Sequence, residues 1–148
     1  MFNNLPVAVV GSRHGSSLPV ARVCYHLLGQ HCQIVTGCAS GVDRQVRQAV
    51  PSAKVITAMS FVRRGLPVSA ALAARTKAVI SSAQAVCIFP PPSGNLGTGS
   101  SLALLTALEQ NIPVWVAGSV APTRLGWQRL ELSGVSGWVF MPAINSLF

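Results

Sequence analysis

The sequence predicts a three-layer α/β domain with a mainly parallel β-sheet. Short apolar runs rich in valine alternate with segments that carry apolar residues at helical spacing, and glycine or proline separates many of these segments. Parallel strands need long crossover connections, so this alternation favours a parallel sheet with helices packed on its faces. A chain of 148 residues is long enough for one such domain and too short for two, so we expect residues 1–148 to form a single domain.

Apolar patterning predicts the first three elements. Leu5–Val10 is a short valine-rich run that ends at a glycine, as a buried parallel strand does. Leu18–Leu28 places four apolar side chains on one helical stripe, which indicates a helix with one buried face. Gln33–Thr36 is a second strand and is again followed by glycine. Together they predict a strand–helix–strand unit.

The middle of the chain continues the alternation. Val42–Val50 is predicted to be a short helix that Pro51 closes, because proline cannot donate the backbone hydrogen bond that a longer helix would need. Ala53–Thr57 is predicted to be the third strand and Met59–Leu66 a loop. The alanine-rich segment Val68–Ser81 predicts the next helix.

The last third begins with the fully apolar run Ala85–Phe89, which predicts a buried strand. A glycine-rich loop follows, and the apolar pattern over Ser100–Gln110 predicts a helix. Pro113–Ala117 is predicted to be a strand, Arg124–Leu132 a short helix, and Trp138–Met141 a last strand at the sheet edge.

The composition is apolar and basic. Half of the residues are hydrophobic and only 9% are charged, so we expect part of the apolar surface to be covered in a homo-oligomer. Eleven basic residues oppose three acidic ones, which gives a net charge of +8. Such a charge favours polyanionic partners such as nucleic acid, although a solvated basic surface is the alternative interpretation.

The cysteines and the hydropathy pattern argue against two classes of protein. The four cysteines form no C-x-x-C pair and have no histidine at ligand spacing, so we expect no metal site, and no cofactor is indicated. No apolar run approaches the roughly 18 residues of a membrane-spanning helix, so we expect a cytoplasmic protein without membrane contacts.

Three glycine-rich loops follow predicted strands, over residues 11–17, 37–43 and 90–101. Ligands of parallel α/β sheets bind at the carboxyl ends of the strands, so we expect these loops to lie together. Glycines let backbone N–H groups approach a phosphate, hydroxyls add donors, and helix N-termini favour negative charge. The candidate ligand-binding residues are Gly11, Ser12, Arg13, Gly37, Gly41, Asp43, Arg75, Gly94, Asn95, Gly97, Thr98, Gly99 and Ser100.

Several residues of these loops have two interpretations. Asp43 either stabilises the first turn of its helix through the helix dipole or has a functional role, which would be to accept hydrogen bonds from a ribose or to orient Arg13 or Arg44. Cys38 is either a small residue in a tight turn or a nucleophile, and no base for it is evident. Further basic candidates for contacts with nucleic acid are Arg44, Arg47, Arg63, Arg64 and Lys77.

The motifs resemble the SLOG superfamily of Rossmann-like nucleotide-binding domains, which includes the DprA/Smf DNA-processing proteins and the LOG phosphoribohydrolases. The resemblance covers about residues 5–118 and rests on the segments 7–13, 36–43 and 93–98 together with Arg75. Residues 37–43 look most like the DprA loop Ser-Gly-Gly-Ala-Arg-Gly-x-Asp, from which Cys38 and Ser40 depart. The resemblance implies a Rossmann-like fold and, for a DprA-like member, binding of single-stranded DNA.

The LOG motif Pro-Gly-Gly-x-Gly-Thr-x-x-Glu is only partly present. Aligning it on Gly97 and Thr98 puts Ser101 in the position of the catalytic glutamate and Asn95 in that of a glycine. Glycosidic cleavage generally needs a carboxylate, so a phosphoribohydrolase is disfavoured and would have to use Asp43. The sequence therefore favours a non-catalytic protein that binds a nucleotide or nucleotide-derived ligand, with DprA-like binding of single-stranded DNA as the alternative.

Overall fold

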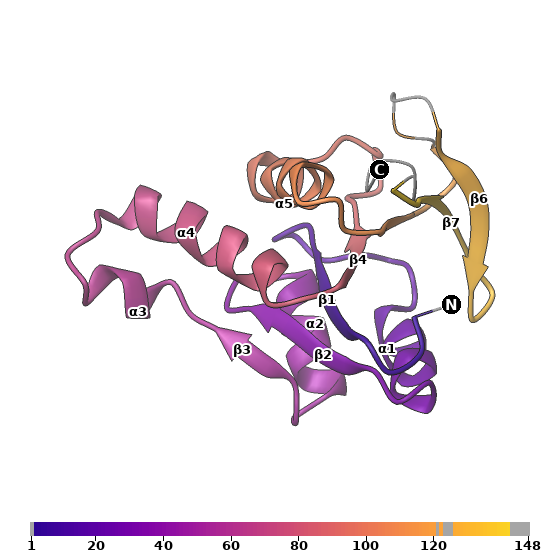
Figure 1. Ribbon diagram of the computed structural model, residues 1–148, viewed down its shortest axis with the longest axis horizontal. Coiled ribbons are helices and arrows are strands. Elements are labelled where there is room, and N and C mark those ends of the chain that lie inside the picture. Colours follow the sequence, from indigo (N-terminus) through magenta and orange to yellow (C-terminus); the bar gives the residue numbers. More distant parts are fainter. Residues whose placement is uncertain (1, 121, 123–125, 143–148) are drawn as a thin grey trace, which may run out of the picture.

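The computed structural model describes residues 2–120, 122 and 126–142. They form an α/β domain with one seven-stranded sheet of order β3-β2-β1-β4-β5-β7-β6, shown in Figure 1. In chain order the elements are β1 (Pro6–Gly11), α1 (Val20–Gly29), β2 (Gln33–Gly37), α2 (Val42–Ala49), β3 (Lys54–Ile56), α3 (Met59–Val62), α4 (Val68–Ser81), β4 (Ala85–Phe89), α5 (Thr98–Glu109), β5 (Val114–Ala117), β6 (Gln128–Leu132) and β7 (Val135–Phe140). The predicted mainly parallel α/β fold is confirmed.

The first five strands are parallel, and the order in which they pair creates a crevice between β1 and β4. The chain moves outward from β1 to β2 and β3, then returns to the other side of β1 as β4 and continues to β5. The loops after β1 and β4 therefore leave the sheet in opposite directions. Such a reversal point is where parallel α/β sheets bind ligands, at the carboxyl ends of the strands.

Two apolar cores lie on the two faces of the sheet and give the domain its three layers. On one face α1 and α2 pack against β1, with Leu27 and Val46 among the fully buried side chains. On the other face α4 and α5 cover β4 and β5, and Ile80 and Ile88 are fully buried. Figure 1 shows the two helix pairs on opposite sides of the strands.

The C-terminal part of the described chain corrects the predicted helix Arg124–Leu132. Residues 124 and 125 lie outside the described residues, and Gln128–Leu132 is strand β6, which pairs antiparallel with β7. Ser133 and Gly134 join the two strands with positive φ angles of 51° and 79°, as a two-residue hairpin turn of the primed type requires. The apolar spacing was misassigned because the Ser-Gly turn signal was overlooked.

The predicted strand Trp138–Met141 exists as β7 but begins earlier, and its predicted place at the sheet edge is wrong. β7 lies between β5 and β6, so β6 forms the edge. Trp115 fixes the hairpin to the parallel strands, because its ring lies against Gly137 and its Nε1–H donates to the Leu130 carbonyl at 3.0 Å.

The segment predicted as a loop, Met59–Leu66, contains the one-turn helix α3. Among the described residues, no helix combines the length and the apolar character that a membrane span requires.

Candidate ligand-binding site

A cavity of about 790 Å³ opens at the carboxyl ends of β1 and β2, bounded by α4 and by the start of α5. Its volume lies in the range of small-molecule binding sites. Most of the predicted ligand-binding residues line it: Gly11, Ser12, Arg13, Gly37, Asp43, Arg75, Asn95, Gly97, Thr98, Gly99 and Ser100. Gly41 and Gly94 do not line this cavity but support the loops that do.

The loop after β1 is held against the loop after β2 by main-chain contacts. The Ser12 carbonyl accepts hydrogen bonds from the N–H of Gly15 at 3.1 Å and of Val42 at 2.9 Å. The Ser40 hydroxyl donates to the Arg13 carbonyl at 2.9 Å. Gly41, with φ at 73°, lies so close that a side chain there would overlap the main chain of Ser12 and Arg13. The two loops therefore form one packed unit that presents the exposed Arg13 side chain.

The N-terminus of α5 faces the same cavity without a side-chain cap. Gly97 is the N-cap residue and makes no capping hydrogen bond with a side chain, and Thr98, Gly99 and Ser100 form the first turn. The first N–H groups of a helix have no partner within the helix, and the helix dipole adds partial positive charge there. Because these donors line the cavity wall, this end of α5 is suited to an anionic oxygen.

Arg47 stabilises the loop after β2. Its Nη1 donates to the Gly37 carbonyl at 2.8 Å and to the Ala39 carbonyl at 2.9 Å. The Arg47 guanidinium, which was predicted to contact nucleic acid, is therefore bound to the protein's own main chain. A further contact in the same loop is the Ala39 N–H, which donates to Asp43 Oδ2 at 3.3 Å.

Asp43 is 5% exposed and carries the carboxylate that lines the cavity. Burial raises the pKa of Asp43 above its ordinary value, and the positive charge of Arg75 and the Ala39 N–H only partly offset this effect. A carbon added at Gly37 would overlap the carboxylate and would lie 3.4 Å from Arg75 Nε. Gly37 thus allows the carboxylate to sit beside the guanidinium.

Arg75 also contacts Cys38, for which the sequence left two interpretations, a small residue in a tight turn or a nucleophile. Arg75 Nη1 lies 3.4 Å from Cys38 Sγ, and the Ala58 N–H donates to the same sulfur at 3.3 Å. Burial raises the pKa of the Cys38 thiol, but the Ala58 N–H, the hydrogen bond from Arg75 and its charge outweigh burial, so the pKa is lowered overall. Arg75 therefore lies between a thiol and a carboxylate at the base of the cavity.

Cys38 should consequently react first when the folded protein meets a thiol reagent. We expect iodoacetamide to label Cys38 with a pH midpoint below that of an ordinary exposed thiol, because the pKa of Cys38 is lowered. Cys24, Cys32 and Cys87 should react slowly, because burial raises the pKa of each thiol, that of Cys24 to about 12. Quenched labelling followed by peptide mass spectrometry measures all four rates.

Arg75→Ala should move the Cys38 midpoint upward, because it removes a hydrogen bond and a positive charge from the thiolate. Arg22→Ala is the matched control, since it removes an equal charge from an exposed site on α1. A Cys38 midpoint at or above the ordinary value, or one that Arg75→Ala leaves in place, would contradict this account of the site.

One wall of the cavity was missed by the sequence analysis. Ser69, Leu72, Ala73, Thr76 and Val79 line it from α4. Their spacing of three and four residues is that of a single helical face, and Arg75 lies on the same helix. That spacing was the available signal, but the weak amphipathic character of an alanine-rich helix obscured it.

The remaining basic candidates lie outside this cavity. Arg44 is exposed on α2, and Lys77 is exposed on α4. Arg63 and Arg64 follow α3, and the Arg64 guanidinium lies 5.4 Å from the centre of the Phe61 ring. Within the residues that the structure describes, no group of three His, Cys, Asp or Glu side chains is placed to hold a metal ion.

Comparison with known proteins gives a relationship at the level of the fold. No family model and no curated protein matches the sequence. The structure is similar to that of DNA processing protein A from Helicobacter pylori, which was solved to show its single-stranded DNA binding mode. The TM-score is 0.64 at 20% sequence identity, over 83% of this chain and 67% of the other. The chain therefore shares the DprA fold.

Proposed function

We propose that this chain is a DprA-like member of the SLOG superfamily that binds single-stranded DNA, with one backbone phosphate in the 790 Å³ cavity. The observation that carries the proposal is the convergence of Arg13, Arg75 and the uncapped N-terminus of α5 on that cavity. A planar guanidinium binds two phosphate oxygens at once, and helix N–H groups bind a third.

The charge of the chain supports a polyanionic ligand. The net charge is +8, and Asp43 supplies the carboxylate in the cavity lining. That carboxylate is buried beside Arg75, so it does not present a bare negative charge to a phosphate. The similarity to a protein with a known single-stranded DNA binding mode favours a strand over a free nucleotide.

Binding of a free nucleotide is the second candidate, and the volume of the cavity favours it, because 790 Å³ suits a ligand of that size. Hydrolysis of such a nucleotide has little support. Ser101 is exposed, and its hydroxyl donates to the Leu96 carbonyl at 3.4 Å instead of joining the cavity lining. A hydrolase would have to rely on Asp43, whose carboxylate already accepts the Ala39 N–H.

Fluorescence anisotropy with a labelled thymidine oligonucleotide tests the proposal. We expect the affinity to fall steeply between about 50 and 200 mM salt, with a logarithmic slope near −0.7 for each phosphate neutralised on a single strand. Unlabelled thymidine monophosphate should compete only weakly. Competition by the mononucleotide at equal concentration, with a shallow salt dependence, would support the second candidate. Absence of binding to both ligands would overturn the proposal.

A further inference from the structure

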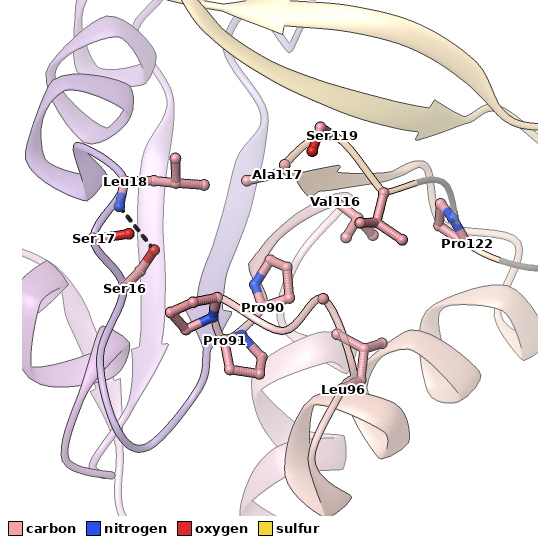
Figure 2. A pocket seen from close by; sticks show the side chains of 14 residues that line it. Ser16, Ser17, Leu18, Pro90, Pro91, Leu96, Val116, Ala117, Ser119 and Pro122 are labelled. Atoms are coloured by element: carbon pink, nitrogen blue, oxygen red, sulfur yellow. Dashed lines mark hydrogen bonds between the residues drawn. The ribbon is translucent and has the colours of Figure 1, made fainter.

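A second cavity lies on the other side of the proline segment that follows β4. Its volume is about 270 Å³, and its walls come from the loop after β1, the prolines 90–92 and the segment after β5. Figure 2 shows Leu18 on one side of the cavity and Val116 and Leu96 on the other, with Pro90 and Pro91 between them. Pro91 lines both this cavity and the larger one. The two cavities are therefore neighbours that share a wall.

The lining of the smaller cavity differs in chemistry from that of the larger one. Leucine, valine and proline side chains provide apolar surface, and no ionisable side chain lies among its described lining residues. The hydroxyls of Ser16, Ser17 and Ser119 are the side-chain polar groups. A phosphate there would lose hydration without gaining a counter-charge from the described lining residues, so these residues favour a neutral group over an anion. It suits a neutral, flat ring with a few polar atoms at its edge.

The walls of the smaller cavity are held in place before any ligand binds. Gln45 fixes Ser16 through two hydrogen bonds, from the Ser16 N–H to Oε1 at 3.0 Å and from Nε2 to the Ser16 carbonyl at 3.2 Å. Ser16 Oγ accepts the Leu18 N–H at 3.1 Å, which leaves the hydroxyl hydrogen available as a donor. On the opposite wall the Gly94 N–H donates to the Pro91 carbonyl at 2.8 Å. A preformed wall reduces the entropy lost on binding.

We propose that the smaller cavity binds a nucleobase of the same DNA strand whose phosphate lies in the larger cavity. The proposal rests on the proposed function and adds the place where the strand's base is recognised. The faces of Pro90 and Pro91 supply flat apolar contact, and the serine hydroxyls meet the polar edge of the base. The anionic and the neutral parts of one strand would thus occupy the two sides of Pro91.

An oligonucleotide with and without its bases tests this assignment. Stacking of a base on an aromatic side chain contributes about 5- to 150-fold in affinity, and contact with the proline faces should give a loss at the lower end of this range. The parent protein should therefore bind an abasic strand, with the phosphates intact, more weakly by a factor in this range. The slope of affinity against salt should be equal for both strands, because no phosphate contact changes.

Two variants that fill the cavity make the test specific. Ser17→Trp and Ser119→Trp replace exposed serines on opposite walls, neither of which lines the larger cavity. Each should bind the intact strand as weakly as the parent binds the abasic one, and each should no longer distinguish the two. Ser52→Trp, at an exposed serine outside both cavities, is the matched control and should behave as the parent.

The outcomes separate this proposal from the function on which it rests. Failure of the parent to bind either strand would overturn the proposed function. Salt-dependent binding of both strands with equal affinity, or filled variants that still distinguish them, would retain the function and overturn the base site. Retained binding by the control excludes a general effect of an added tryptophan.

Discussion

The substitution Gly41→Ala should destabilise the protein by about 3–5 kcal/mol, the largest effect expected of any change at the site. Gly41 has φ at 73° and ψ at −127°, a conformation that residues with a side chain rarely adopt. The added carbon would also overlap the carbonyl oxygens of Ser12 and Arg13. Neither oxygen can move away without breaking its hydrogen bond to the loop after β2.

Urea unfolding of parent and variant measures this effect as a change in the free energy of unfolding. Gly29→Ala is the matched control, because Gly29 ends α1 and has no atom within 4 Å of an added carbon. It should change the stability by at most about 0.5 kcal/mol. A Gly41→Ala protein within about 1 kcal/mol of the parent would show that the two loops are less tightly packed than their contacts indicate.

Sequence reasoning located the strands and the three loops because their signals are local. The valine-rich run before Gly11 and the apolar run before Pro90 each mark where a strand ends. The alternation of strands and helices indicates parallel strands, whose carboxyl ends lie at one edge of the sheet. The failure at Gln128–Leu132 has the opposite cause. A short run with spaced apolar residues fits a helix or a strand, and the Ser133–Gly134 turn together with the pairing partner decides between them.

The direction of a long charged side chain was beyond prediction from sequence. Arg47 lies on α2 and Arg75 on α4, and both were candidates for ligand contact. In the structure Arg47 donates hydrogen bonds to carbonyls of the loop after β2, whereas Arg75 lines the cavity. Which arginine lines the cavity depends on where the folded loop places the Gly37 and Ala39 carbonyls, and no local sequence pattern encodes that placement. The smaller cavity escaped notice for the same reason, because its walls come from three separate segments.

Arg75→Ala should weaken the binding of single-stranded DNA by about 10- to 150-fold at moderate salt, the range expected when a charged hydrogen-bonding partner of a phosphate is removed. The salt slope should become shallower by roughly the contribution of one phosphate. Anisotropy titrations at several salt concentrations measure both quantities. Arg22→Ala, which removes the same charge from the opposite face of the sheet, should lower the affinity by less than about threefold, through long-range electrostatics alone.

The stability of the Arg75→Ala protein must be measured at the pH of the binding assay, because Asp43 loses its neighbouring charge. Asp43 has a raised pKa in the folded state, so its contribution to stability is present at low pH and is lost as the pH rises through that pKa. Removing Arg75 raises the pKa further, so the variant should be destabilised more at neutral pH than near pH 4. Weakened DNA binding by a variant that remains folded at neutral pH then reports phosphate contact. Unchanged affinity and salt slope in that folded variant would remove Arg75 from the site.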